Sequence, residues 1–180
     1  MLNSSPSHRP PSVAEAWIAN RFGLWYAAAD RWGVRRLRLI PIGAAKSAAP
    51  PGLGSPEATP EERMLERMLI ELQGYFAGMR RTFETPLSPA LEMSVFMRET
   101  ADAVRRIAYG SVATYSQVAE RMGRPGARRA IGQALARNPV LLYIPCHRVV
   151  AATGKLAGFS AGTATKARLI AFEAHMREGR

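Results

Sequence analysis

The chain has 180 residues, of which 47% are hydrophobic and 22% are charged, so it is long enough for one domain or two small ones and has the composition of a globular protein. No apolar run approaches the length of a membrane span, and the N-terminal sequence MLNSSPSHRPPS lacks the apolar stretch of a secretory signal. The single cysteine excludes an internal disulfide and a cysteine-rich zinc site, and we expect a protein of the reducing cytoplasm.

The charge is strongly positive and unevenly distributed. Lys and Arg number 25 against 14 Asp and Glu, a formal net charge of +11. Residues 1–100 hold 12 basic and 10 acidic side chains, whereas residues 101–180 hold 13 and 4. Such a field favours a polyanionic partner, and arginine can donate two hydrogen bonds to one phosphate or guanine. A GC-rich genome that uses arginine on ordinary solvated surfaces explains the same numbers, so charge alone leaves both interpretations open.

A β-hairpin is predicted near the N-terminus. The apolar run 22–29 and the run 34–40, which alternates apolar with basic residues, flank a turn at Asp30–Gly33, and this pattern predicts two strands with one solvated face. Residues 1–13 are rich in Pro and Ser and are expected to be loose. Residues 41–60 are rich in Pro, Gly, Ala and Ser and predict a flexible connection.

A helix is predicted after this connection. Thr59 is a suitable cap, Pro60 suits the first helical position, and two glutamates occupy the first turn. Apolar residues then recur at helical spacing from Met64 to Phe76.

The prolines at 86 and 89 interrupt the chain and mark a predicted domain boundary. We expect an N-terminal α/β domain of residues 1–85 and a C-terminal domain of residues 86–180. A further helix is predicted over 94–107. The predicted fold class is α+β: a small N-terminal domain with a β-hairpin or sheet and a helix, then a mostly helical domain.

Two short helices with a glycine turn follow. Residues 114–122 and 127–136 predict helices, and Gly123–Gly126 predicts the turn between them. This arrangement is typical of a helix-turn-helix that binds DNA, and Arg128 and Arg129 lie in the first turn of the second helix, where recognition residues usually lie. Helical hairpins with basic ends also form through packing alone, and the pattern does not separate the two interpretations.

The only cysteine, Cys146, precedes His147 and Arg148 in the segment IPCHRVV. A thiolate is a nucleophile, and a nearby imidazole or guanidinium lowers the pKa of a thiol. Many lone cysteines are inert packing residues, but packing requires neither of these polar neighbours. In an extended chain adjacent side chains point to opposite sides, so a bridging water would carry the proton between Cys146 and His147.

An imidazole that acts as a base needs a carboxylate to orient it. Acidic residues are scarce after residue 100, and Glu173, in a helix predicted over 165–176, is the candidate. A surface position for Glu173 is the alternative.

The segment IPCHRVV resembles the active-site signature of the O6-alkylguanine-DNA alkyltransferases. Further motifs follow that family's order and spacing over about residues 86–180, and residues 71–83 resemble the segment before its catalytic domain. The motifs are Tyr109-Gly110, Thr114-Tyr115, Pro125-x-Ala-x-Arg-Ala-Ile-Gly132, Asn138-Pro139, Gly154-x-Leu-x-Gly-Phe159, Lys166-x-x-Leu-Ile and Glu173.

The resemblance implies DNA repair by direct, irreversible transfer of an alkyl group from guanine, chiefly O6-methylguanine, to Cys146, once per molecule. It implies no metal and no organic cofactor, a monomer without membrane contact, and double-stranded DNA containing alkylated guanine as partner. The protein would be cytoplasmic and associated with the nucleoid through DNA.

The resemblance also implies roles for individual residues. His147 acts as a base through water, Glu173 orients it, and Asn138 ties the helix-turn-helix to the active-site loop. Arg129 enters the base stack in place of the flipped nucleotide. The implied substrate and DNA contacts are Tyr115 near the flipped nucleotide, Arg128 at a phosphate, the main chain of Cys146 and Val149 at the exocyclic amine, the Ser160 backbone at the guanine oxygen, and Ala130, Gly132, Leu135, Arg148 and Phe159.

The chain departs from the family pattern at three positions. Ala101 stands where the family has Trp, Ala108 where it has Pro, and Phe159 where it has Tyr, so the rate and the accepted alkyl size are open. Three other functions remain as alternatives: an alkylguanine sensor of the same fold that performs no transfer, a cysteine hydrolase, and a plain DNA-binding regulator.

Overall fold

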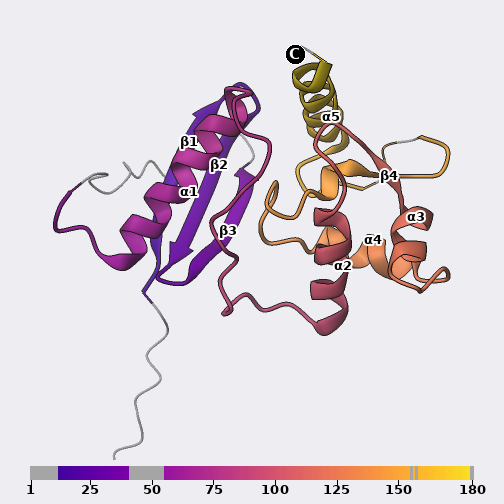
Figure 1. Ribbon diagram of the computed structural model, residues 1–180, viewed down its shortest axis with the longest axis horizontal. Coiled ribbons are helices and arrows are strands. Elements are labelled where there is room, and N and C mark those ends of the chain that lie inside the picture. Colours follow the sequence, from indigo (N-terminus) through magenta and orange to yellow (C-terminus); the bar gives the residue numbers. More distant parts are fainter. Residues whose placement is uncertain (1–11, 41–54, 155, 157, 179–180) are drawn as a thin grey trace, which may run out of the picture.

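The computed structural model describes residues 12–40, 55–154, 156 and 158–178. Its first part is an antiparallel sheet of three strands, β1 (Ala14–Asn20), β2 (Gly23–Asp30) and β3 (Gly33–Ile40), in the order β1-β2-β3. In Figure 1 this sheet and helix α1 form one side of the molecule and helices α2 to α5 the other. The mixed α+β class predicted from the sequence is confirmed.

The predicted hairpin is present as β2 and β3. The buried Asp30 carboxylate closes its turn by accepting hydrogen bonds from the backbone N–H of Trp32 at 2.9 Å and of Gly33 at 3.1 Å. Strand β1 was not predicted. Its sequence, AEAWIAN, is rich in alanine, which has a low strand propensity, and the strand forms because β2 offers a full ladder from Ala14↔Ala29 to Asn20↔Gly23.

Helix α1 (Pro60–Phe76) covers the sheet and begins where the sequence predicts it. Thr59 and Glu62 form a capping box: the Thr59 hydroxyl accepts from the Glu62 N–H, and the Glu62 carboxylate accepts from the Thr59 N–H. The apolar face of α1 meets the sheet around Trp25, which is fully buried.

The helical part contains α2 (Val95–Arg105), α3 (Tyr115–Arg121), α4 (Arg128–Ala136) and α5 (Thr163–Glu178). All four lie within three residues of their predicted ends. Three short elements of this part were not predicted: the single turn η1 (Cys146–Arg148), and two strands that pair in parallel, β4 (Ala113–Thr114) and β5 (Val149–Val150).

Strand β3 connects the two parts. Val34 exchanges backbone hydrogen bonds with Pro86 and Ser88, and Leu37 does so with Pro139 and Leu141. The approach is tight at Gly33, where a Cβ atom would lie 2.2 Å from the Pro86 carbonyl oxygen. One cluster of buried apolar residues runs through both parts. The boundary at residue 86 falls where the chain crosses between them, and the division into two domains stays a prediction.

Two predictions fall on segments that the structure does not describe. Of the loose N-terminus predicted over residues 1–13, residues 1–11 lie outside the described residues, and of the flexible connection predicted over 41–60, residues 41–54 do; α1 begins at the last residue of this predicted connection, Pro60. Within the described part of the chain, no helix is long and apolar enough to cross a membrane.

Candidate active site

Cys146 is 5% exposed and begins the turn η1, so the stretch that was predicted as extended is instead helical. The Asn138 side-chain amide donates to Cys146 Sγ at 3.1 Å and to the Ile144 carbonyl at 2.8 Å. The Asn138 carbonyl oxygen accepts from the Val140 N–H at 2.9 Å. Because Asn138 follows α4 directly, one side chain joins the helix pair to the loop that carries the cysteine.

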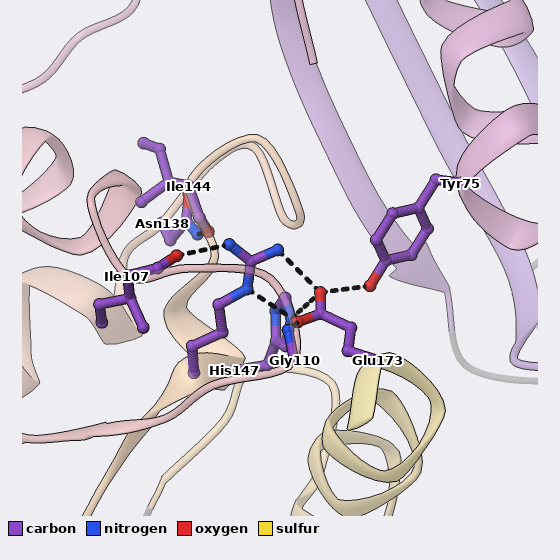
Figure 2. A network of polar contacts seen from close by, with 8 residues as sticks. Tyr75, Ile107, Gly110, Asn138, Ile144, His147 and Glu173 are labelled. Carbon is purple, nitrogen blue, oxygen red and sulfur yellow. Dashed lines mark hydrogen bonds and ion pairs between the residues drawn. The ribbon is translucent and has the colours of Figure 1, made fainter. Parts of the chain in front are cut away.

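Glu173, on α5, is the centre of a buried polar network that reaches His147 and Arg148 (Figure 2). Its Oε1 lies 2.9 Å from His147 Nε2 and accepts from Arg148 Nη2 at 2.9 Å, while its Oε2 accepts from Arg148 Nε at 2.9 Å. Arg148 Nη1 also donates to the Ile107 carbonyl at 2.8 Å. Glu173 is 1% exposed, so the alternative of a surface acid is wrong.

Two residues that the sequence analysis did not place in the site complete this network. The Tyr75 hydroxyl, from α1, donates to Glu173 Oε1 at 2.8 Å, and the Gly110 N–H donates to Oε2 at 3.0 Å. Gly110 has a φ of +70°, and a Cβ atom there would lie 2.9 Å from the Glu173 carbonyl oxygen, so glycine suits this close approach.

The environment sets distinct protonation states. Burial raises the pKa of Cys146 to about 11, although the Asn138 hydrogen bond and the charge of Lys166 act in the opposite direction. Burial also lowers the pKa of His147, against the effect of Glu173. Burial opposes the ionisation of Glu173. The hydrogen bonds and charges of His147 and Arg148 outweigh this effect of burial and lower the pKa of Glu173 to about 2. At neutral pH the resting site therefore holds a thiol, a neutral imidazole and a carboxylate.

Lys166 is a charged neighbour of the thiol that the sequence analysis did not place in the site. Its side chain is fully buried at the start of α5 and interacts electrostatically with Cys146. A nearby ammonium stabilises a thiolate more than a thiol. The Lys166 motif within the family resemblance was the available signal.

A cleft of about 840 Å³ opens between α3, α4 and the segment after β5. Tyr115, Arg128, Arg129 and Gly132 line it. Tyr115 also interacts electrostatically with Cys146, so this cleft-lining side chain lies near the thiol. Arg128 and Arg129 are exposed and carry positive charge at the mouth of the cleft.

The remaining predicted contacts occupy different environments. Ala130 and Ser160 are exposed, and Phe159 is half-buried against the core. Leu135, Val149 and Arg148 are buried, and the Arg148 guanidinium is bound to Glu173 and Ile107 rather than directed to the surface. Among the described residues no cluster of His, Cys, Asp and Glu could hold a metal ion.

Acid should weaken the fold through Glu173. The folded-state pKa of about 2 lies below the ordinary 4.5, so this group stabilises the fold above about pH 4.5 and loses that contribution as the pH falls towards 2. The difference corresponds to about 3 kcal/mol. His147 acts in the same direction, because its lowered pKa makes the unfolded chain take up the proton first. Urea unfolding at pH 7 and pH 3 measures the loss, and equal midpoints would contradict it.

The site combines a buried thiol, a neutral imidazole held by a carboxylate, and a helix pair with exposed arginines at a cleft, and these are the parts that the sequence predicts for a cysteine nucleophile next to a helix-turn-helix. Residues 95–175 match the family described as 6-O-methylguanine DNA methyltransferase, DNA binding domain. A methylated-DNA–protein-cysteine methyltransferase of Methanosarcina acetivorans is 40% identical over 103 residues, which are 57% of this chain and 65% of that protein. One of Mycolicibacterium paratuberculosis is 39% identical over 115 residues, 64% of this chain and 68% of that protein.

Solved structures resemble almost the whole chain. The crystal structure of the Mycobacterium tuberculosis O6-methylguanine methyltransferase has a TM-score of 0.75 and 28% identity, and the match covers 94% of this chain and 97% of that one. A structure of the M. tuberculosis protein in complex with DNA has a TM-score of 0.74 and 29% identity, with 90% and 93% covered. This chain belongs to the methylated-DNA–protein-cysteine methyltransferase family. The sequence alignments themselves span about two thirds of the relatives' length.

Proposed function

We propose that the protein repairs DNA by moving an alkyl group from O6 of guanine to Cys146. The observation that carries the proposal is the arrangement of the thiol and its base: Asn138 holds Cys146, and Glu173 holds Nε2 of the neighbouring imidazole. The other ring nitrogen, His147 Nδ1, is buried without a hydrogen-bond partner among the described residues. With Nε2–H donating to Glu173, Nδ1 is the basic nitrogen and is available to take a proton.

The proposed chemistry is a single displacement. The thiol proton passes to His147 Nδ1, through water, and the sulfur attacks the alkyl carbon. The S–C bond forms as the C–O6 bond breaks, and the electron pair of the broken bond stays on guanine, to which the proton returns. The products are a thioether at Cys146 and an unmodified guanine. No step regenerates the thiol, so each molecule reacts once.

The cleft would receive the damaged nucleotide. An alkylated O6 inside a duplex is out of reach of a buried thiol, so the nucleotide must leave the stack, at a cost of a few kcal/mol. We propose that Arg129 fills the space it leaves and that Arg128 contacts a phosphate. Gly132 lies beside the Tyr115 ring, and a Cβ atom there would make ordinary van der Waals contact with the ring at 3.8 Å. We propose that Tyr115, which lines the cleft, contacts the flipped nucleotide.

Other assignments follow from burial. Arg148 is proposed to position Glu173 rather than to contact DNA, and Leu135 to anchor α4 in the core, because both side chains are buried. In this proposal the main chain of Val149 contacts the exocyclic amine of the alkylated guanine. Phe159 and the Ser160 backbone contact the same base. We further propose that the protein acts as a monomer and needs no cofactor for this step.

Intact-mass measurement after incubation with excess duplex containing O6-methylguanine tests the proposal. The expected result is a gain of one methylene unit per chain, mapped to Cys146, with no further gain on longer incubation. Binding of the duplex without a change in mass would instead indicate a lesion sensor or regulator. Release of modified product with turnover would indicate a hydrolase.

Arg129→Ala should slow repair in duplex DNA more than reaction with the free base O6-methylguanine. The free base has no stack to leave, so a side chain that fills the gap affects the duplex alone. We expect a loss of about 10- to 100-fold in duplex, equivalent to about 1.4 to 3 kcal/mol. Single-turnover rates on both substrates provide the comparison.

Arg67→Ala is the matched control, because Arg67 is an exposed arginine of α1 outside the cleft. It removes one positive charge and should leave the ratio of the two rates unchanged. An equal loss on duplex and free base in Arg129→Ala would exclude the proposed role of Arg129.

A further inference from the structure

Tyr75 links the first part of the chain to the carboxylate of the candidate site. It lies in the last turn of α1, is fully buried, and donates its hydroxyl to Glu173 Oε1 at 2.8 Å across 98 positions of sequence. In Figure 2 Tyr75 approaches Glu173 from the side opposite Ile107. Nothing in the proposed displacement uses this hydroxyl.

The oxygen that Tyr75 contacts is the one that holds the imidazole. Glu173 Oε1 receives the Tyr75 hydroxyl, His147 Nε2 and Arg148 Nη2, while Oε2 receives Arg148 Nε and the Gly110 N–H. Each donor withdraws electron density from the carboxylate and weakens its attraction for the other donors. The Tyr75 hydroxyl therefore competes with His147 for one oxygen atom.

The surroundings of Tyr75 and Glu173 keep the Tyr75 hydroxyl protonated, so that it donates its hydrogen bond. Burial raises the pKa of Tyr75 well above its ordinary value, and the charge of Glu173 adds to the effect, while Arg148 opposes it. Tyr109 also faces Tyr75 and Glu173, and Arg81 and Arg21 act on Tyr109. On the far side, Arg148 and Lys166 act on His147. Because burial and the charge of Glu173 both disfavour the phenolate, the phenol stays protonated across the working pH range and donates to Glu173 throughout.

We propose that Tyr75 is a positioning residue of the alkyl-transfer site, which fixes the Glu173 carboxylate and limits the basicity of His147 by sharing Oε1 with it. The inference rests on the proposed function and extends it to α1. Without the hydroxyl, Oε1 would interact more strongly with a protonated imidazole. His147 would then hold its proton to higher pH, and the neutral base would be scarcer in mildly acidic solution.

A second contact on the same helix provides a contrast. Glu71, one turn before Tyr75, accepts from the Tyr143 hydroxyl at 2.8 Å, and the Tyr143 ring packs on Phe83 with centroids 4.4 Å apart. Tyr143 precedes Cys146 by three residues, and its hydroxyl bonds Glu71 rather than Glu173. Removal of its hydroxyl affects the loop and makes no change at either oxygen of Glu173.

The test is the pH profile of single-turnover alkyl transfer for the wild-type chain, Tyr75→Phe, Tyr143→Phe and Tyr26→Phe. Tyr75→Phe keeps the ring and its packing against Phe83, Tyr109 and Phe172, so folding should persist. Tyr26 also donates to a glutamate, Glu15, but on the surface of the sheet, which makes Tyr26→Phe the matched control.

We expect the acid limb of the Tyr75→Phe profile to move up by roughly 0.5 to 1 pH unit, a three- to tenfold lower rate on that limb, with rates converging at high pH. Tyr143→Phe should lower the rate without moving the limb, and Tyr26→Phe should match the wild type. If Tyr75→Phe lowered the transfer rate equally at every pH and left the acid limb of the profile in place, Tyr75 would be a packing residue only and the inference would be wrong.

A second readout separates this inference from the proposed function. Cys146 is the only cysteine, so its alkylation by iodoacetamide, followed by mass, reports the ionisation of this thiol alone. If the wild type transfers no methyl group from DNA, the proposed function fails. The inference about Tyr75 then stands only if the pH profile of iodoacetamide alkylation in Tyr75→Phe is shifted from that of the wild type. If the wild type transfers the group and both profiles of Tyr75→Phe match Tyr26→Phe, the inference alone fails.

Discussion

Cys146→Ala should abolish alkyl transfer and preserve DNA binding. No second thiol exists to take over, and the exposed arginines of α4 that would contact DNA do not touch the Cys146 side chain. Asn138 would lose its hydrogen bond to Sγ but keep its bond to the Ile144 carbonyl, so the loop should retain its path. We expect no mass gain after long incubation with the damaged duplex, whereas wild type gains one methylene unit.

DNA binding of Cys146→Ala is measured by fluorescence anisotropy over a series of salt concentrations. Affinity should stay within about threefold of wild type and fall with salt at the same slope, since phosphate contacts dominate both. Cys146→Ser keeps the size of the side chain and should be equally inactive, because a hydroxyl is a far weaker nucleophile at neutral pH. Residual transfer in either variant would mean that the nucleophile is another group.

Glu173→Gln should have the second largest effect, on both stability and rate. The carboxylate accepts from five donors, and an amide would place its own N–H groups against some of them and leave the Arg148 charge buried without an anion. Breaking a buried ion pair in this way costs about 3 to 5 kcal/mol. The imidazole would also lose its preferred tautomer and orientation, so we expect transfer to slow by about 10² to 10⁴-fold in the folded fraction.

Urea unfolding and single-turnover rates at low temperature, where circular dichroism shows the variant to be folded, separate these two effects. Glu178→Gln is the matched control on the same helix. Glu178 is exposed, and its pair with Arg177 at 3.9 Å lies on the surface, where such pairs contribute about 0 to 1 kcal/mol. If Glu173→Gln behaved like Glu178→Gln in both measurements, the network around Glu173 would have no role in either folding or transfer.

The helices were predictable because their signals are local. Thr59 with Glu62, and Thr114 with Gln117, mark helix starts through hydrogen bonds that span three residues. Strand β1 was not predictable from its own residues, because an alanine-rich strand forms only when a neighbour supplies its hydrogen-bond ladder. The 3-10 turn at Cys146 was missed for a related reason: Asn138 and the loop before it determine the path of the chain there.

The sequence by itself determined which residues are available for chemistry and the order in which they occur: one thiol, its histidine neighbour, a basic helix pair and a scarce acid in the last helix. Only the tertiary structure decided how they act together. It buried Glu173 against His147, bound Arg148 inside rather than at the surface, and brought Tyr75 to the same carboxylate from 98 positions away. Contacts between residues so far apart in the sequence depend on the packing of α1 and α5 against a shared core. The spacing of residues along the chain does not reveal this packing.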